Sequence, residues 1–205
     1  MAYPATDCCV NLYTVMSNQN RTLQRKVPAP TLTKSAIAQE ALALIDSEGL
    51  PAFSTRKLGT RLGVEAMALY HHFSSKHLLT AEVAATIRAQ IPLPPADLGW
   101  RSWLGQAARS WRATGLAHPY AVPLLIAHPA EDDPLFAGQC RVLETAGLTL
   151  HEARRAARLI AAFVTGAAQN EIAQPEDAPA IFERGLVMLL DGIAKQIQRT
   201  REHAL

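Results

Sequence analysis

From Thr33 onward, apolar residues recur at intervals of three or four along most of the chain. The first such segment places Ile37, Ala41, Leu44 and Ile45 on one face of a helix. Alanine and leucine dominate the composition, and both favour helix more than β-branched residues do. Spacing and composition together predict an all-α fold.

Prolines, glycines and capping residues mark where these helices begin and end. Thr33 and Ser54 are suitable N-caps, and Gly49 and Gly63 are suitable at helix ends. The segment IPLPPADLG holds three prolines, which a helix interior does not tolerate. We therefore expect helices between the caps Thr33 and Gly49, over 55–62, over 66–73, from 76 to about 90, over 100–116, in one short piece within 117–134, over 135–146, for about six turns after Thr149, and over 180–199.

Composition limits the class of protein. Hydrophobic residues make up 49% of the 205 residues and charged residues 19%, which suits a packed core rather than a disordered chain. No window approaches the ~20 uninterrupted apolar residues of a membrane helix, and the N-terminus is a poor signal peptide. Three cysteines without zinc-ligand spacing indicate free thiols in a reducing compartment. We expect a cytoplasmic protein without a membrane partner.

Charge is unevenly distributed, although the formal net charge is only +2. Residues 21–90 hold nine basic and five acidic residues, whereas residues 91–205 hold eleven basic and twelve acidic residues. A basic N-terminal half beside a near-neutral C-terminal half favours a nucleic-acid-binding module joined to a second domain. An imbalance of this size also arises by chance, so charge alone leaves both interpretations open.

The segment FSTRKLGTRLGVEAMALYHHFSSKHLL predicts two short helices joined by a turn at Gly63, a helix-turn-helix. The second helix begins with Ala66, Met67 and Ala68, which fit a major groove about 12 Å wide and suit thymine methyl groups. All-helical domains that bind no DNA also contain helix–glycine–helix segments. Flanking donors for DNA phosphates are Thr55, Arg56, Lys57, Tyr70, His71 and Lys76.

About fifty residues resemble the N-terminal domain of the TetR family of transcriptional repressors. The resemblance rests on Leu32-Thr33, on Glu48-Gly49, on the stretches STRKLGTRLGV and LYHHF, and on Ser75-Lys76. It implies a three-helix DNA-binding unit whose recognition helix spans 66–72. It implies base contacts by Ala66, Met67 and Ala68 and backbone contacts by Thr55, Arg56, Tyr70, His71 and Lys76; Lys57 and His72 complete the expected interface.

The expected recognition helix has few hydrogen-bond donors for bases, so the operator sequence does not follow from these residues. Family members often have a polar residue at one of the positions 66–68. Glu65 either accepts from cytosine N4 or caps the recognition helix.

The C-terminal part resembles the corresponding domain of the tetracycline repressor subfamily. The similarity lies in the tryptophan-led helix at 100–116, in GLTL at 147–150 and in the F-x-x-G of 163–166. It implies dimerisation and a small-molecule pocket. The last two helices agree with dimerisation, because helices that pair small and large apolar residues pack closely in four-helix arrangements. Candidate pocket residues, each of which also suits an ordinary core, are Trp103, Leu104, Trp111, Tyr120, Leu124, Phe136, Phe163 and Met188.

No metal or cofactor is expected. His118, His128 and His151 lack the close helical spacing of metal ligands. The resemblance implies a histidine and a glutamate around magnesium, but His128 and Glu171 match those positions only approximately.

Together these observations predict a homodimeric transcriptional repressor that a small-molecule effector releases from its operator. We expect a disordered arm at 1–30, in which Met16 is a candidate start, a DNA-binding domain at 31–91 and a dimerisation and effector domain at 92–205. The expected partners are a palindromic operator in double-stranded DNA, a second copy of the chain and an unidentified effector. An activator, a ligand-independent regulator and a helical scaffold that binds no DNA are alternatives. No nucleophile–base set, paired acids or phosphate loop points to an enzyme.

Overall fold

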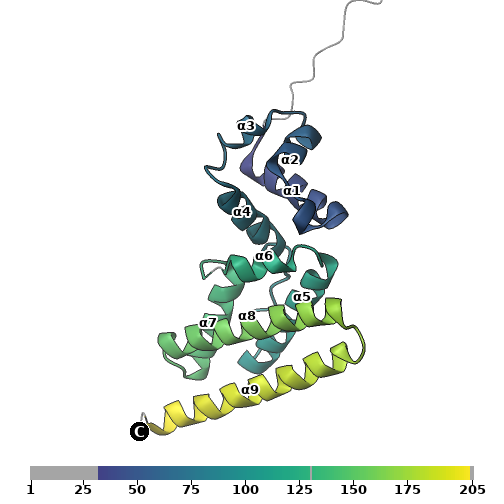
Figure 1. Cartoon of the computed structure of the whole chain (residues 1–205). Coiled ribbons are helices and arrows are strands. Elements are labelled where there is room, and N and C mark those ends of the chain that lie inside the picture. The colour runs from purple at the N-terminus through teal and green to yellow at the C-terminus, as the bar shows by residue number, and fades with distance from the viewer. Residues whose placement is uncertain (1–31, 130, 204–205) are drawn as a thin grey trace, which may run out of the picture. The chain divides into compact units, whose positions relative to one another are not determined.

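Every regular element among the described residues is helical, which confirms the all-α prediction (Figure 1). The computed structural model describes residues 32–129 and 131–203. The disordered arm expected at 1–30 therefore lies outside the described residues. Residues 33–129 and 131–203 belong to one compact unit.

Helix α1 (Lys34–Glu48) and helix α2 (Thr55–Leu62) both begin at hydroxyl caps, as the sequence predicts. The side chain of Thr33 accepts a hydrogen bond of 3.1 Å from the first turn of α1. Ser54 does the same for α2 at 3.3 Å. A short 3-10 helix, η1 (Leu50–Ala52), joins the two helices.

Helix α3 (Ala66–Leu69) is shorter than the helix expected over 66–73, and this prediction is corrected. The backbone N–H groups of Tyr70, His71 and His72 each bond a carbonyl three residues back, so the chain continues in tight turns. Tyrosine and histidine have a lower helix propensity than alanine, which fits the change at this point. The recognition segment is thus one α-helical turn with a 3-10-like turn after it.

Six more helices follow α3 in the described residues. The sequence predicted the bounds of five of them, and these lie within two residues of the observed ones except at the C-terminus of the last; α6 was expected only as one short piece within 117–134. Helix α8 begins with a complete capping box, in which Thr149 and Glu152 each bond the backbone of the other. The six helices are α4 (Lys76–Arg88), α5 (Trp100–Ala117), α6 (Val122–Ala127), α7 (Pro134–Ala146), α8 (Leu150–Ala173) and α9 (Ala178–His203).

Helix α9 extends past the expected end at Arg199, because polar contacts continue it after the apolar pattern stops. Gln198 Nε2 donates to Glu202 Oε1 at 2.9 Å, a pair one helical turn apart. Arg201 Nη2 donates to the carbonyl of Ala146, at the end of α7, at 2.8 Å. These contacts involve polar residues that carry no periodic apolar signal.

Helix α4 packs against α1 on one side and against α5 and α6 on the other (Figure 1). It therefore joins the three N-terminal helices to the C-terminal ones within the same compact unit. Helices α8 and α9 run antiparallel as a hairpin (Figure 1). A hydrophobic core cluster lies between α5, α7, α8 and α9, and its fully buried members include Leu104, Leu143, Ile160 and Leu186. Burial of each such side chain contributes roughly 1.5–3 kcal/mol.

Candidate nucleic-acid interface and ligand cavity

The turn between α2 and α3 brings the two helices unusually close. A Cβ atom placed on Gly59 would lie 2.8 Å from the carbonyl oxygen of Val64 and 3.2 Å from the nitrogen of Ala66. Val64 N also donates to the carbonyl of Gly59 at 2.9 Å. Gly63 closes α2 with a φ of 67°, a conformation open to glycine without steric cost. Glycines at these two positions therefore set the helix-turn-helix geometry.

Most residues of the recognition segment are exposed or half-buried, and one buried residue anchors the segment to the core. Leu69 is buried, whereas the Met67 side chain is 71% exposed. Tyr70 and His71 are also exposed, and Ala66, Ala68 and His72 are half-buried. The surface around Met67 is therefore open to a large partner.

The cationic residues expected at this surface differ in whether another group of the chain already holds them. Among the described residues, Arg56 has no ion-pair partner. Lys57 Nζ lies 2.6 Å from Glu48 Oε2, in an exposed ion pair. Lys76 Nζ donates to the carbonyl of Phe53 at 3.3 Å and lies 5.3 Å from the centre of that ring. Arg56 is therefore the cation most available for a phosphate.

A cavity of about 460 Å³ lies among helices α4 to α8 and the segment that follows α6. Its walls are mainly apolar and include Trp111, Leu125 and Phe136. Thr165 and Gly166 contribute from α8. The volume and the mixed lining are typical of sites that enclose a small organic molecule.

Of the eight residues predicted to line a pocket, the structure brings two, Trp111 and Phe136, to this cavity. Trp103 and Leu104 belong to the core, and Leu124 is buried on α6. The sequence did not distinguish these positions, because the same residue types fill cores and line cavities.

The other three predicted residues also lie elsewhere. Phe163 stacks on Phe182 with ring centres 5.7 Å apart. Tyr120 is exposed, and Met188 lies on the outer face of α9 with 69% of its surface exposed. Met188 instead lines a separate surface hollow on α8 and α9.

Arg88, at the end of α4, is a wall residue that the sequence did not single out. Its Nη1 donates to the carbonyl of His128 at 2.8 Å, and its Nε lies 3.3 Å from Asp133 Oδ2. Burial lowers the pKa of Arg88, and the Asp133 carboxylate partly opposes that shift. One side chain of α4 thus reaches both the cavity and the segment that follows α6.

His128, which ends α6, makes a second set of contacts with α4. Its Nε2 lies 3.0 Å from Thr80 Oγ1, and its ring centre lies 4.5 Å from that of His77. Desolvation lowers the pKa of His128 below 6.5, and the charges of His77 and Arg88 act in the same direction. The neutral imidazole is therefore the favoured form at this contact.

The two residues weighed for a magnesium site are both engaged with other groups. His128 is held by Thr80, as described above. Glu171 forms a two-point ion pair with Arg112, with distances of 2.7 and 2.5 Å. Within the described part of the chain, no group of three or more His, Cys, Asp or Glu residues is arranged to hold a metal ion.

The other two histidines considered as metal ligands also belong to no metal-binding group among the described residues. His118 Nδ1 lies 2.8 Å from Asp46 Oδ2, and its Nε2 lies 3.0 Å from Gln90 Oε1. His151 is exposed on α8. His118 therefore serves a polar contact between α1, α5 and the end of α4.

Apolar side chains are exposed along α8 and α9. Leu159 on α8 is 61% exposed, and Ile181 and Met188 on α9 are 58% and 69% exposed. Leu159 and Met188 line a shared hollow of about 480 Å³. Exposed apolar side chains that share a surface hollow, as Leu159 and Met188 do, are typical of a site of protein association.

None of the helices in the described residues is long and apolar enough to cross a membrane.

A helix-turn-helix with an open face, joined through α4 to a helical domain with a cavity, defines the class of DNA-binding transcriptional regulators. Family models support this class in both halves. Residues 37–83 match the model of bacterial regulatory proteins of the tetR family, and residues 91–177 match that of tetracyclin repressor-like C-terminal domains.

The chain is 31% identical to the tetracycline repressor protein class A from transposon 1721 of Escherichia coli. That match covers 80% of this chain and 92% of the relative. The chain belongs to the TetR family of bacterial regulatory proteins.

Two solved structures share the fold. A TetR variant from Acinetobacter baumannii AYE in complex with minocycline has a TM-score of 0.74 and 27% identity, over 81% of this chain and 98% of that chain. BioQ with its natural double-stranded DNA operator has a TM-score of 0.69 and 27% identity, over 80% of this chain and 99% of that chain.

Proposed function

We propose that the protein is a homodimeric repressor that binds a palindromic operator and leaves it when a small molecule fills the cavity at Trp111. The open recognition segment around Met67 is the observation that carries the DNA-binding part. The solved BioQ complex, a relative with the same fold bound to its operator, supports it. The minocycline complex supports control by an organic effector.

At the DNA, we assign base contacts to Ala66, Met67 and Ala68, at the start of the recognition segment. Arg56 is the phosphate contact with the strongest support, because its guanidinium has no other ion-pair partner in the described part of the chain. Lys76 uses one of three ammonium donors within its own domain, which leaves two for a phosphate. Thr55, Lys57, Tyr70, His71 and His72 complete the interface.

Homodimers are typical of the family. We propose that two copies pair through α8 and α9, where Leu159, Ile181 and Met188 expose apolar surface. A twofold axis between the copies places two recognition segments about one DNA turn apart, roughly 34–36 Å, and so reads a palindrome.

Coupling between effector and DNA is proposed to run through α4. Arg88 belongs to the cavity wall and to α4, and it bonds the carbonyl of His128. An effector that rearranges this wall would tilt α4 and change the separation of the two recognition segments. A coupling free energy of ~1–3 kcal/mol is enough to change operator occupancy substantially.

We further propose a domain division at about 31–91 and 92–205, regulation rather than catalysis as the role, and the cytoplasm as its location. A transcriptional activator with the same architecture differs only in its effect on transcription once it has bound DNA. A scaffold that binds no DNA offers no explanation for the open recognition segment.

Selection of bound fragments from random-sequence DNA tests this proposal. The wild-type protein should enrich a palindrome with two half-sites, and a Tyr70→Ala, His71→Ala double variant should retain much less DNA. Enrichment of no sequence by a protein that is folded and dimeric would contradict the proposal.

A further inference from the structure

His118 is the C-cap of α5, and its ring lies between α1 and the end of α4. Its Nδ1 lies 2.8 Å from Asp46 Oδ2 on α1, and its Nε2 lies 3.0 Å from Gln90 Oε1, just after α4. An ionised carboxylate only accepts hydrogen bonds, so Nδ1–H is the donor to Asp46. The His118 side chain is largely enclosed, with 15% of its surface exposed. One side chain at the end of α5 therefore contacts both α1 and the end of α4.

The backbone of His118 is fixed among the C-terminal helices. Its N–H donates to the carbonyl of Gly115 at 3.2 Å, and its own carbonyl accepts from Val122 N at 3.2 Å, at the start of α6. A Cβ atom placed on Gly115 would lie 3.4 Å from the Cβ of Ala168, so the last turn of α5 lies close to α8. Trp111, in the cavity wall, precedes His118 by about two turns on α5. The His118 ring is therefore held by a helix that also forms part of the cavity.

Asp46, the partner of His118 on α1, is only partly satisfied. Its second carboxylate oxygen, Oδ1, is buried without a hydrogen-bond partner in the described part of the chain. A carboxylate oxygen that is removed from water and left unpaired is unfavourable. Without the His118 donor, the carboxylate would gain hydration if α1 moved outward. The hydrogen bond from His118 therefore opposes a movement of α1.

This contact links α1 directly to the C-terminal helices. Helix α1 packs extensively against α2, η1 and α4, and none of the described helices after α4 packs on it to the same degree. The polar contacts of Thr80 and Arg88 with His128 start from α4 itself. Contacts on one helix leave rotation about that helix open, whereas a further contact on α1 restricts it. The His118 contact therefore adds a restraint that the contacts of α4 do not supply.

We propose that His118 is a positioning residue that fixes the orientation of the DNA-binding unit, α1 to α3, on the C-terminal helices. This inference rests on the proposed function, because the orientation matters when a dimer binds two half-sites together. Once one recognition segment is bound, the other binds with an effective concentration that depends on how freely it moves. A fixed unit keeps that concentration high. In this role His118 contacts no DNA and acts on the second binding step alone.

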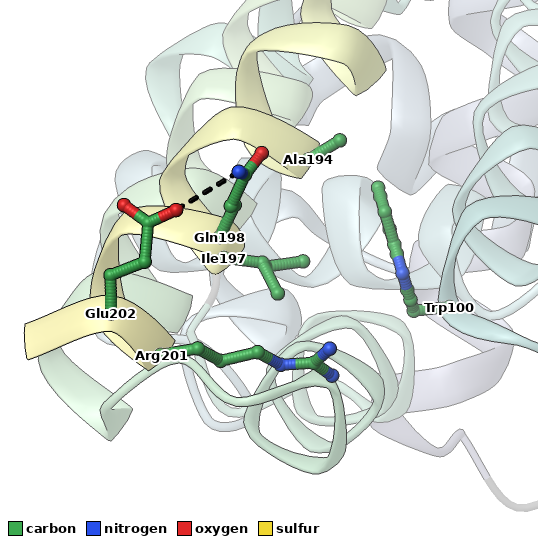
Figure 2. Close-up of a pocket in the computed structure, with 6 residues that line it drawn as sticks. All are labelled: Trp100, Ala194, Ile197, Gln198, Arg201 and Glu202. Carbon is green, nitrogen blue, oxygen red and sulfur yellow. Dashed lines mark hydrogen bonds between the residues drawn. The ribbon is translucent and has the colours of Figure 1, made fainter. Parts of the chain in front are cut away.

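The last turns of α9 supply a control, because a polar pair there lies within one helix (Figure 2). Gln198 Nε2 donates to Glu202 Oε1 at 2.9 Å. Both side chains border a surface hollow of about 350 Å³ with Trp100, at the start of α5. Gln198→Ala therefore removes a side-chain hydrogen bond that joins neither α1 nor α4 to another helix.

Affinity for two DNA duplexes separates positioning from direct contact. One duplex carries the palindrome that the wild type selects from random-sequence DNA, and the other carries the same sequence with one half-site scrambled. His118→Ala should lower affinity for the palindrome about tenfold and change affinity for the single half-site less than about twofold. Asp46→Ala should have the same effect, and the double variant should bind no more weakly than either single variant. Fluorescence anisotropy of labelled duplexes measures both affinities.

Two further variants distinguish positioning from a general loss of structure. His118→Asn keeps a side-chain N–H donor for Asp46 and should recover most of the palindrome affinity. Gln198→Ala should leave both affinities unchanged. If His118→Ala does not fold, Asp46→Ala decides, because it removes a carboxylate that is only partly paired.

The outcomes separate this inference from the proposed function. An equal loss on both duplexes, or unchanged palindrome affinity in His118→Ala and Asp46→Ala, would overturn the positioning role while the proposed function stands. A folded wild-type dimer that binds the palindrome no better than the single half-site would contradict the proposed function, and the positioning role with it.

Discussion

At the residue scale, two neighbouring cations on α2 differ in how available they are to bind a DNA phosphate, because only one of them has an ion-pair partner among the described residues. Lys57 is held by Glu48 at 2.6 Å, whereas Arg56 has no ion-pair partner in the described part of the chain. The sequence offers both as flanking donors for DNA phosphates and does not show that one of them is paired. The structure makes them different, because a paired cation must give up its partner before it can neutralise a phosphate.

Arg56→Ala should therefore weaken binding to all DNA sequences and lower the slope of log affinity against log salt by about 1. Lys57→Ala should have a smaller effect, because Glu48 already neutralises that charge. Fluorescence anisotropy across a salt series, with Arg101→Ala as a control distant from the interface, measures both. A loss restricted to one operator variant would count against the phosphate role.

His128 predicts a pH dependence of folding stability. Desolvation, then His77 and Arg88, lower its pKa below 6.5, so the unfolded chain takes up a proton first as the pH falls. The contribution of the neutral His128 side chain to folding stability is fully present above pH 6.5, and it is lost as the pH falls through the folded-state pKa.

Replacement of His128 by glutamine should make denaturant midpoints between about pH 7 and 5 less dependent on pH than those of the wild type. His151→Gln, on the exposed face of α8, should keep the wild-type dependence. Parallel pH profiles for the wild type and His128→Gln would show that the His128 contact does not titrate.

At the element scale, local signals predicted the helix-turn-helix well. The caps Thr33 and Ser54 and the stop at Gly63 are where the sequence predicts them, because capping depends on a few neighbouring residues. The 3-10-like turn after Leu69 and the extension of α9 were not predicted. The turn depends on backbone hydrogen bonds to carbonyls three residues back, and the extension depends on a hydrogen bond from Arg201 to the carbonyl of Ala146.

Gly59→Ala tests the close approach of α2 and α3. The added methyl would lie 2.8 Å from a backbone oxygen, so α3 must move. Operator affinity should fall at least about tenfold, and the protein should lose roughly 1–3 kcal/mol of unfolding free energy. Gly99→Ala, where nothing lies within 4 Å of the added carbon, is the matched control. Wild-type affinity in Gly59→Ala would contradict this packing.

Few of the residues that line the cavity were predicted from the sequence. Trp111 and Phe136 were anticipated, but Arg88, Leu125 and Thr165 were not. Apolar residues at helical spacing look alike whether they face another helix or a cavity. Nothing in the sequence indicates that the arginine at the end of α4 is buried, because its burial depends on the segment that follows α6.

At the scale of the whole molecule, helix α4 connects the helices of the DNA-binding unit with those beside the cavity. Helix α4 contacts α1 of the DNA-binding unit and also α5 and α6 beside the cavity. A change at Arg88 or His128 therefore has a direct route to the recognition segment. The dimer adds a fixed spacing, so a small tilt of α4 in each copy alters how two half-sites are read.

The proposed dimer predicts the effect of a charge on its surface. Leu159→Glu should produce a monomer of 22.2 kDa by light scattering and should reduce operator affinity strongly. Leu93→Glu, a substitution at a residue 51% exposed on the segment after α4, should remain dimeric. A dimeric Leu159→Glu protein would place the interface elsewhere.

Footprinting on the DNA upstream of the protein's own gene, across a salt series, tests the central claim most directly. We predict a protected palindrome, with half-sites about one DNA turn apart and protection that declines steeply as salt rises. Absence of protection there, together with no sequence enriched from random DNA by the folded dimer, would contradict the assignment as a DNA-binding repressor.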